Sequence, residues 1–218
     1  DVVIAIPPYY SAVERQAVLD ACKIANVNCL KLVNDNTAIS LSYGFFWRKD
    51  FKETEPTNVA FVDVGHAKTT VTIASFTQKK VKIITHKSNR NLGAWNFDAS
   101  ILNKVGQEFF DKYKVDPWTN PKARIRMLDT IEKARIILSG NLESSINIEC
   151  LIDDFDLSRS LKREEFETLI APNLADLATL IEQTIHDSGL THADISSVEM
   201  VGCGTRIPAI LETSQKAF

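Results

Sequence analysis

The sequence lacks several features that would place it at once in a membrane, nucleic-acid-binding or disulfide-rich class. No apolar run reaches the roughly 18 residues of a membrane-spanning helix, and no signal-peptide pattern is present. No block of Lys or Arg occurs, and the formal net charge of −3 argues against a nucleic-acid partner. Internal repeats and low-complexity tracts are absent too. With 44% apolar and 24% charged residues over 218 positions, the composition predicts a globular chain with a sizeable core.

Cysteine is sparse, and the residues present show neither a C-x-x-C pair nor the spacing of a zinc site. They are Cys22, Cys29, Cys150 and Cys203. We therefore expect reduced thiols in a reducing compartment. The location that we expect is the cytoplasm, with the lumen of the endoplasmic reticulum as the alternative. Because an apolar strand pattern begins directly after Asp1, we also expect the sequence to belong to a longer protein, whose targeting signals it does not contain.

Alternating and helical apolar patterns divide the chain into mixed strands and helices. Strands are predicted at residues 2–6, 29–33, 59–63, 69–76, 79–85, 145–151, 155–157 and 197–201. Helices are predicted after the Ser11-x-x-Glu14 capping box, at residues 38–46, 92–113, 120–140 and 163–188, and from Pro208 onward. This mixture predicts the α/β or α+β class.

Local patterns add expectations about burial and boundaries. The continuous apolar run Val2–Ile6 fits a strand that is buried on both faces. The first helix carries apolar residues at helical spacing, which are Ala17, Val18, Ala21, Ile24 and Ala25. The charged stretch 48–58 contains a proline and is the best candidate for a boundary or hinge, and Pro172 should disturb the long helix 163–188.

A carboxylate and a glycine lie at a tight turn between two apolar runs, in the segment FVDVGHAKTTVTI from Phe61 to Ile73. Asp63 is suited to holding a hydrated metal ion, because small hard cations prefer oxygen ligands and keep several waters. Gly65 permits close approach of the backbone, whose N–H groups can meet phosphate oxygens. The alternative is an ordinary hairpin in which Asp-x-Gly serves only as turn chemistry.

A second glycine turn lies about 140 residues further on, between an apolar strand and a helix that begins near Pro208. Gly202 and Gly204 stand where the backbone of a strand–helix junction can approach a ligand, and the helix dipole there favours negative charge. A lone Gly-x-Gly is weak evidence. Together, the two turns predict one nucleotide that is held from both sides.

These motifs and two others occur in the order Asp63-Val-Gly65, Leu92-Gly93-Ala-Trp-Asn-Phe97-Asp98, Ile131-Glu132-Lys-Ala-Arg135-Ile-Ile-Leu138-Ser139 and Val201-Gly202-Cys-Gly204-Thr-Arg206-Ile-Pro208. In this order and spacing the chain resembles the nucleotide-binding domain of the seventy-kilodalton heat-shock chaperones. Asp63-Val-Gly-His66, Asn96-Phe-Asp98 and Ile146-Asn-Ile-Glu-Cys150 resemble more closely the larger, one-hundred-and-ten-kilodalton branch of that superfamily. The resemblance covers essentially the whole chain, but only part of the family's domain.

The resemblance implies an α/β, actin-like (ribonuclease-H-like) ATPase fold that binds ATP or ADP with Mg²⁺. By the same resemblance, residues 1–50 are the last part of lobe I. Residues 51–97 and 190–218 form the inner subdomain of lobe II, and residues 98–189 form its outer subdomain.

The resemblance also implies a set of site residues. The nucleotide-binding candidates are Asp63, Gly65, His66, Gly93, Ala94, Glu132, Arg135, Ser139, Gly202, Gly204 and Arg206, and the metal candidates are Asp35 and, indirectly, Asp63. Ordinary structure offers alternatives. Asp35 suits the N-cap of a helix that begins near Ala38. Glu132 and Arg135 suit a solvated helix face that carries an i, i+3 ion pair.

The chain departs from the seventy-kilodalton pattern at several of these positions. In the Asp63 turn, His66, Ala67 and Lys68 replace two glycines and a threonine, and Thr70 replaces a second catalytic aspartate. In the loop before the long helix, Ala94 and Trp95 replace a Gly-Glu or Gly-basic pair. Elsewhere, Asn36 replaces a proline switch and Ile136 replaces a basic residue. Lys68 fits either a phosphate contact or a solvated lysine. Trp95 fits either packing or crowding of the γ-phosphate, and Cys203, which also replaces a glycine, is expected to be a small buried side chain.

The resemblance implies a co-chaperone that binds ATP, hydrolyses it weakly or not at all, accelerates nucleotide exchange on a heat-shock-seventy chaperone and holds unfolded polypeptides through other domains. The altered phosphate turn and Thr70 favour this hypothesis, because phosphoryl transfer depends on preorganised charge and position. An active chaperone ATPase and a degenerate interaction module that no longer binds nucleotide are the alternatives. Neither a nucleic-acid nor a membrane partner is expected.

Overall fold

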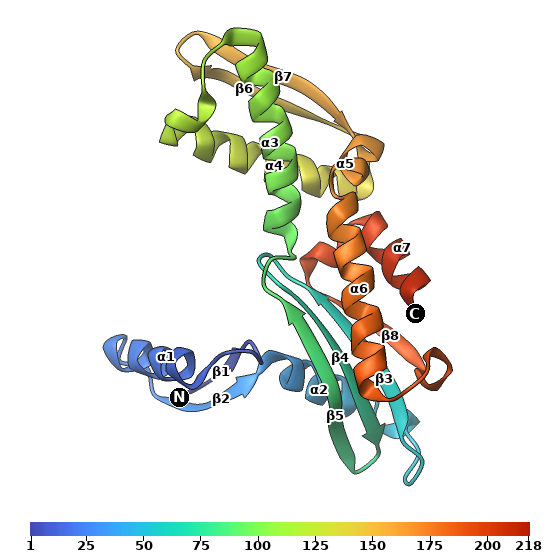
Figure 1. The fold of residues 1–218 in the computed structure, drawn as a ribbon. Coiled ribbons are helices and arrows are strands. Elements are labelled where there is room, and N and C mark those ends of the chain that lie inside the picture. Colours follow the sequence, from blue (N-terminus) through green and yellow to red (C-terminus); the bar gives the residue numbers. More distant parts are fainter. The chain divides into compact units, whose positions relative to one another are not determined.

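The computed structural model describes all 218 residues (Figure 1). The strands are β1 Val2–Ile6, β2 Cys29–Asn34, β3 Thr57–Val64, β4 Thr69–Thr77, β5 Lys80–Asn89, β6 Glu143–Ile152, β7 Phe155–Lys162 and β8 Ser197–Val201. The α-helices are α1 Ala12–Ile24, α2 Asp35–Phe46, α3 Ala94–Tyr113, α4 Pro121–Gly140, α5 Arg163–Leu169, α6 Ala171–Ser188 and α7 Pro208–Ala217. Every helix and strand that the sequence predicts is therefore present, and most are longer than predicted. None of the helices combines the length and the apolar character needed to cross a bilayer.

The chain divides into two compact units. The first comprises Asp1–Val62, Thr70–Ser88 and Gln183–Glu199, and the second comprises Asp63–Thr69, Asn89–Glu182 and Met200–Phe218. Each unit is a group of segments that contact one another more than they contact the rest of the chain. This division is made by contact and not by lobe, so the assignment of residues to lobes and subdomains stays a prediction.

In the first unit, β1 and β2 pair in parallel as a two-stranded sheet. The prediction that β1 is buried on both faces is wrong, because only Ile6 is buried and Val3 is 59% exposed. Burial on both faces requires elements packed against each face, and α2 is the main helical neighbour of β1. Helix α1 begins with the predicted capping box, in which Ser11 Oγ accepts from the Glu14 N–H and the Glu14 carboxylate accepts from the Ser11 N–H.

The buried face of α1 differs from the one that its apolar pattern suggests. Ile24 is 88% exposed and Ala21 is also exposed, whereas Cys22 is buried. Val18, one turn before Cys22, is half-buried. Helix α1 contacts β2, so the side of the helix that carries Val18 and Cys22 provides the packing surface.

A four-stranded sheet in the order β5-β4-β3-β8 forms the main layer of the first unit (Figure 1). Its core is aromatic. The Tyr43 ring of α2 meets Phe61 of β3 at a centroid distance of 5.3 Å and Phe76 of β4 at 5.4 Å, and Phe76 stacks on Phe51 at 5.1 Å. Such ring contacts add to the stabilisation from apolar burial. They hold α2 against the sheet, and α2 follows β2 without a break.

In the second unit, α3 and α4 pack together and the antiparallel hairpin β6–β7 packs on α4 (Figure 1). The register of the hairpin shifts between Ile148 and Ile152, where Cys150 adopts a positive φ of 44°. Arg126 of α4 donates to the backbone oxygens of Glu149 and Cys150 at 2.6 and 2.7 Å. The guanidinium thus provides hydrogen-bond donors for two carbonyl groups at the register shift. The predicted disturbance near Pro172 is also present, as a break at Ile170 between α5 and α6.

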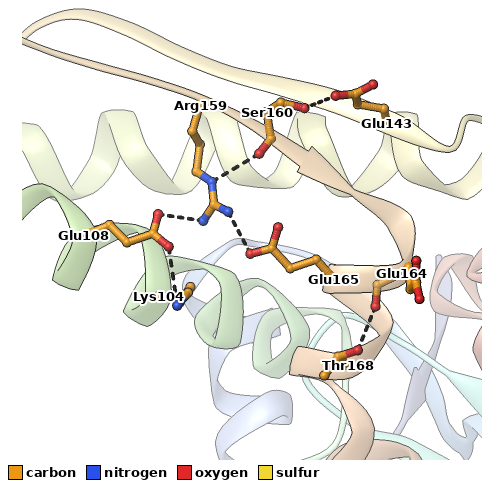
Figure 2. A network of polar contacts seen from close by, with 8 residues as sticks. All are labelled: Lys104, Glu108, Glu143, Arg159, Ser160, Glu164, Glu165 and Thr168. Atoms are coloured by element: carbon orange, nitrogen blue, oxygen red, sulfur yellow. Dashed lines mark hydrogen bonds and ion pairs between the residues drawn. The ribbon is translucent and has the colours of Figure 1, made fainter.

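A polar network fastens β7 to two helices of the second unit (Figure 2). The Arg159 guanidinium forms ion pairs with Glu108 of α3 at 2.8 Å and Glu165 of α5 at 2.7 Å. Lys104 extends the network on α3, and Ser160 bonds to Glu143 across the hairpin. The arginine is mostly buried, so these ion pairs are screened by water less than exposed pairs are.

Candidate functional site

The Asp63 turn is a tight hairpin connection between β3 and β4. The Gly65 N–H donates to the Lys68 carbonyl at 2.9 Å. None of the residues 65–68 has a positive φ. The turn therefore does not need the additional glycines that the seventy-kilodalton pattern has, and His66, Ala67 and Lys68 fit without backbone strain.

The Asp63 carboxylate is mostly buried and lies beside a lysine. Lys68 Nζ is 3.3 Å from Asp63 Oδ2, and each side chain is 17% exposed. The interpretation of Lys68 as a solvated lysine is therefore wrong. The pair holds an ammonium group at the turn where the sequence predicts phosphate, so Lys68 is placed to act as a point charge there.

The second glycine turn packs directly on the first. Gly202 has φ 85° and ψ 155°, and a Cβ at this position would lie 2.4 Å from the Val64 carbonyl oxygen and 2.8 Å from Asp63 Oδ1. This backbone region is essentially restricted to glycine. The sequence predicts Asp63 and Gly202 in one site, and the structure places Gly202 against the Val64 backbone and the Asp63 carboxylate.

The residues between β8 and α7 form a short 3₁₀-helix, Cys203–Arg206, in which Gly204 is buried and Arg206 is exposed. Cys203 is exposed as well. The expectation of a small buried cysteine is wrong, because the 3₁₀ turn directs Gly204 rather than Cys203 toward Val64.

The start of α3 completes the contact. The N–H groups of Ala94 and Trp95 donate to the carbonyls of Gly65 and His66 at 3.0 and 2.8 Å. A Cβ on Gly93 would lie 2.6 Å from the His66 oxygen, so only glycine allows this approach. The first N–H groups of a helix are common anion ligands. Here two of them already have partners within the protein.

A tryptophan lies beside this junction. The Trp95 ring is 44% exposed and lies 6.2 Å from the His66 ring, measured between centroids. The side chain is therefore only partly packed, and it lies next to His66 of the Asp63 turn.

The α4 residues Glu132, Arg135 and Ser139 share one helix face, as predicted, but only part of it is solvated. Arg135 is 6% exposed and donates to Asp98 of α3 at 2.6 Å, while Glu132 is about half exposed and lies 3.7 Å from the guanidinium. Arg135 is therefore not a solvated residue. The Ser139 hydroxyl donates to the Arg135 carbonyl at 3.3 Å within the same helix.

Burial raises the pKa of the Asp98 carboxyl, and the Arg135 guanidinium beside it opposes that rise. Glu132 adds a smaller effect in the same direction as burial, and the charge of His66 acts in the opposite direction. The candidate site thus contains a buried carboxylate whose charge depends on Arg135.

Asp98 is a residue that reasoning from the sequence missed as part of the site. The signal was available, because Asp98 interrupts the apolar stripe of α3 that includes Phe97, Ile101 and Val105. A carboxylate on a buried stripe requires a cationic partner, and only the packing of α4 identifies that partner as Arg135.

Asp35 and Asn36 lie at the start of α2, in the first unit. Asp35 is the first residue of the helix, and Asn34 is its N-cap. The interpretation of Asp35 as the N-cap is therefore wrong, since Asn36 and Thr37 continue the helix toward Ala38. Asn36 is buried and donates to Thr72 at 3.4 Å, while its Oδ1 has no hydrogen-bond donor.

The candidate metal ligands are individual carboxylates that do not form a cluster. No group of three or more His, Cys, Asp or Glu side chains is arranged to hold an ion. A hydrated Mg²⁺ bound to phosphates needs only one or two protein carboxylates, and Asp63 at the glycine junction meets that requirement. Asp35 belongs to the other unit, so its role near the same metal stays a prediction.

Comparison with known proteins gives one consistent result. Residues 1–218 match the family model described as Hsp70 protein. The chain is 40% identical over its full length to heat shock 70 kDa protein 14 of Arabidopsis thaliana, covering 26% of that protein. Also over its full length, it is 38% identical to heat shock protein hsp88 of Neurospora crassa and 36% identical to the 97 kDa heat shock protein of Strongylocentrotus purpuratus, covering 31% and 25% of those proteins. The chain thus spans about a quarter to a third of the length of these relatives.

Proposed function

Because this chain belongs to the Hsp70 protein family, whose nucleotide-binding domain has the actin-like ATPase fold, we propose that it is part of the ATP-binding domain of a co-chaperone. The observation that carries the proposal is the junction of three chain segments at Asp63. The Asp63 turn, the Gly93 loop and the Gly202 turn pack backbone to backbone within the second unit.

In this proposal Asp63 holds a hydrated Mg²⁺, and the backbone around Gly65, His66, Gly202 and Gly204 faces the phosphates. Lys68 contributes positive charge from beside Asp63. Glu132, Arg135, Ser139 and Arg206 border the adenosine. In this arrangement the protein groups would orient a bound nucleotide, and the nucleotide would supply the phosphates that complete the shell of the metal ion.

We propose that hydrolysis is weak. Thr70 stands where the family resemblance implies a second catalytic aspartate, and its hydroxyl lies 2.9 Å from the Ser88 hydroxyl. A threonine in that position cannot supply the negative charge that would orient the metal and the attacking water. Phosphoryl transfer depends on such preorganised charge, so its rate should fall.

The proposed function of the whole protein is nucleotide exchange on an Hsp70 chaperone, together with holding of unfolded polypeptides through other domains. An exchange factor needs only to bind the open state of its partner more tightly than the closed state, because differential affinity shifts the population. This activity requires a well-folded surface and not rapid turnover. We propose the cytoplasm as its location.

A module that has lost nucleotide binding is a second candidate, and one observation favours it. The Ala94 and Trp95 N–H groups are bonded to the Asp63 turn, and these donors are therefore not available to a phosphate. An active chaperone ATPase is the third candidate.

Nucleotide binding separates these candidates. We expect Mg²⁺–ADP to stabilise this chain against urea, by about 2.7 kcal/mol at a hundredfold excess over the dissociation constant. Asp63→Asn should weaken the dependence on Mg²⁺, and Arg206→Ala should weaken binding with or without Mg²⁺. Lys23→Ala, an exposed change on α1, serves as the control. If millimolar ADP leaves the unfolding curve unchanged, the module without nucleotide is the better description.

Exchange activity tests the co-chaperone proposal directly in the full-length protein. We expect it to accelerate the release of a fluorescent nucleotide from an Hsp70 chaperone, and Asp63→Asn should retain this activity. Charge reversal of the exposed residues Lys122 and Arg124 on α4 should reduce it, whereas Lys23→Glu in the first unit should not. If release is not accelerated at any concentration, the exchange proposal fails even where ADP binding is intact.

A further inference from the structure

The carboxylate of Asp63 has a cation of the protein itself beside it. Lys68 Nζ donates to Asp63 Oδ2 at 3.3 Å, and both side chains are mostly buried. The other oxygen, Oδ1, lies on the side of Gly202, where a Cβ would come within 2.8 Å of it. One oxygen of the carboxylate therefore accepts from an ammonium group, and the other borders the second glycine turn.

The backbone of Lys68 is fixed by the hairpin and by the loop before α3. Its carbonyl accepts from the Gly65 N–H at 2.9 Å. A Cβ on Gly93 would lie 2.8 Å from its backbone nitrogen, so the loop packs closely against it. The next residue, Thr69, donates through its hydroxyl to the Leu92 carbonyl at 2.8 Å. The lysine is therefore attached to a rigid frame and not to a flexible loop.

This ion pair differs from lysine pairs at the surface. Lys23, Lys52 and Lys216 each lie next to a carboxylate, and both members of those pairs are more than half exposed. Water and salt screen such exposed pairs, which contribute little to stability. The charge of the mostly buried Lys68 acts on its surroundings with less screening.

We propose that Lys68 takes the place of Mg²⁺ beside Asp63, so that this protein binds ADP with little dependence on the metal. The inference rests on the proposed function, because it needs the nucleotide phosphates at the glycine junction. A hydrated Mg²⁺ in such a site neutralises the carboxylate and attracts the phosphates. The ammonium group of a lysine does both as a point charge, and it carries three N–H donors.

The two cations oppose each other at this carboxylate. Like charges that share one carboxylate repel, so Lys68 lowers the affinity of Asp63 for Mg²⁺. Without the lysine charge, Asp63 is an unpaired anion beside the phosphates, and Mg²⁺ is then needed to neutralise it. By linkage, the factor by which Lys68 reduces the effect of Mg²⁺ on ADP affinity is also the factor by which it reduces the effect of ADP on Mg²⁺ affinity.

The test measures the affinity of the full-length protein for ADP by calorimetry, with excess Mg²⁺ and with EDTA. For wild type, the dissociation constant in EDTA should exceed that in Mg²⁺ by less than about fivefold, and Lys68→Met should raise this ratio at least about fivefold. Lys68→Arg keeps the charge and should retain most of the metal independence. Lys87→Met removes a lysine that pairs with Asp187 at 2.9 Å in the first unit, and it should leave the ratio unchanged.

Metal affinity provides a second readout. Mn²⁺ replaces Mg²⁺ as the probe, because both ions suit carboxylate and water ligands, and its EPR signal reports the free ion. The titration uses ADP-bound protein, with protein in excess over ADP. Lys68→Met should bind Mn²⁺ at least about fivefold more tightly than wild type. Asp63→Asn in the same background should remove this gain.

The outcomes separate this inference from the proposed function. If wild type binds Mg²⁺–ADP but loses about fivefold or more of its affinity in EDTA, Lys68 does not replace the metal. That comparison needs no variant. A smaller increase of the ratio in Lys68→Met than the one expected leads to the same conclusion. If wild type binds ADP in neither condition, the nucleotide site itself is wrong, and the inference about Lys68 is wrong with it.

Discussion

Arg135→Met should lower the free energy of unfolding by about 3 kcal/mol at neutral pH, the low end of the range for breaking a buried ion pair. The reason lies in Asp98, which is 2% exposed and has Arg135 as its cationic partner at 2.6 Å. Methionine fills a similar space but leaves the carboxylate without a counter-charge. Urea denaturation of the two proteins measures the difference.

The loss should depend on pH in a defined direction. Burial already raises the pKa of Asp98 in the folded protein above the usual value of 3.8, and removal of Arg135 raises it further. A raised pKa means that the folded state keeps its proton at pH values where the unfolded state has lost it. The destabilisation of the variant relative to wild type is thus absent below about pH 3.8, where Asp98 is protonated in the folded and the unfolded state. It grows as the pH rises through the pKa of Asp98 in the folded protein. We expect a smaller difference from wild type at about pH 4.5 than at pH 7.

Two variants serve as controls for the Arg135 prediction. Asp98→Leu in the Arg135→Met background should recover most of the stability, because an apolar pair often replaces a buried ion pair without loss. Glu132→Gln should change stability by less than about 0.5 kcal/mol, since Glu132 is half exposed and 3.7 Å from the guanidinium. A loss for Arg135→Met that is the same at both pH values would contradict the assignment to Asp98.

Gly202→Ala should destabilise the protein by about 2–6 kcal/mol and abolish Mg²⁺–ADP binding. The backbone angles at Gly202 alone cost a non-glycine residue about 1–3 kcal/mol. The new methyl group would also lie 2.4 Å from the Val64 carbonyl oxygen, so the end of β3 must move, and overpacking of this kind adds about 1–3 kcal/mol. The unfolding free energy and the response to ADP are the two measurements.

Two other glycines separate these contributions. Gly189 has a φ of 72°, but a Cβ there would meet no atom within 4 Å, so Gly189→Ala should show only the cost of the backbone conformation, about 1–2 kcal/mol. Gly140 has neither feature and ends α4, so Gly140→Ala should be neutral or stabilising by up to about 1 kcal/mol. Equal losses at positions 189 and 202 would show that contact with Val64 is unimportant.

The sequence by itself determined the identity and order of the elements, because their signals are local. Ser11 and Glu14 bond to each other within one turn, and the alternation from Ser145 to Leu151 reports a hairpin whose partner strand follows within a few residues. The family was also readable, since the motifs around Asp63, Gly93, Glu132 and Gly202 carry it without reference to packing. The outline of the candidate site came with the family.

Only the tertiary structure decided which of these residues are buried and what they bond to. The sequence pattern predicts that Val3 is a core residue, but Val3 is exposed. It also suggests a surface position for Arg135, but Arg135 is buried against Asp98, 37 positions away. Likewise, the Ala94 and Trp95 N–H groups are occupied by carbonyls about 30 residues earlier. Burial and hydrogen-bond partners depend on what packs opposite a residue. A local pattern contains no information about that opposite surface, which exists only after distant segments have come together.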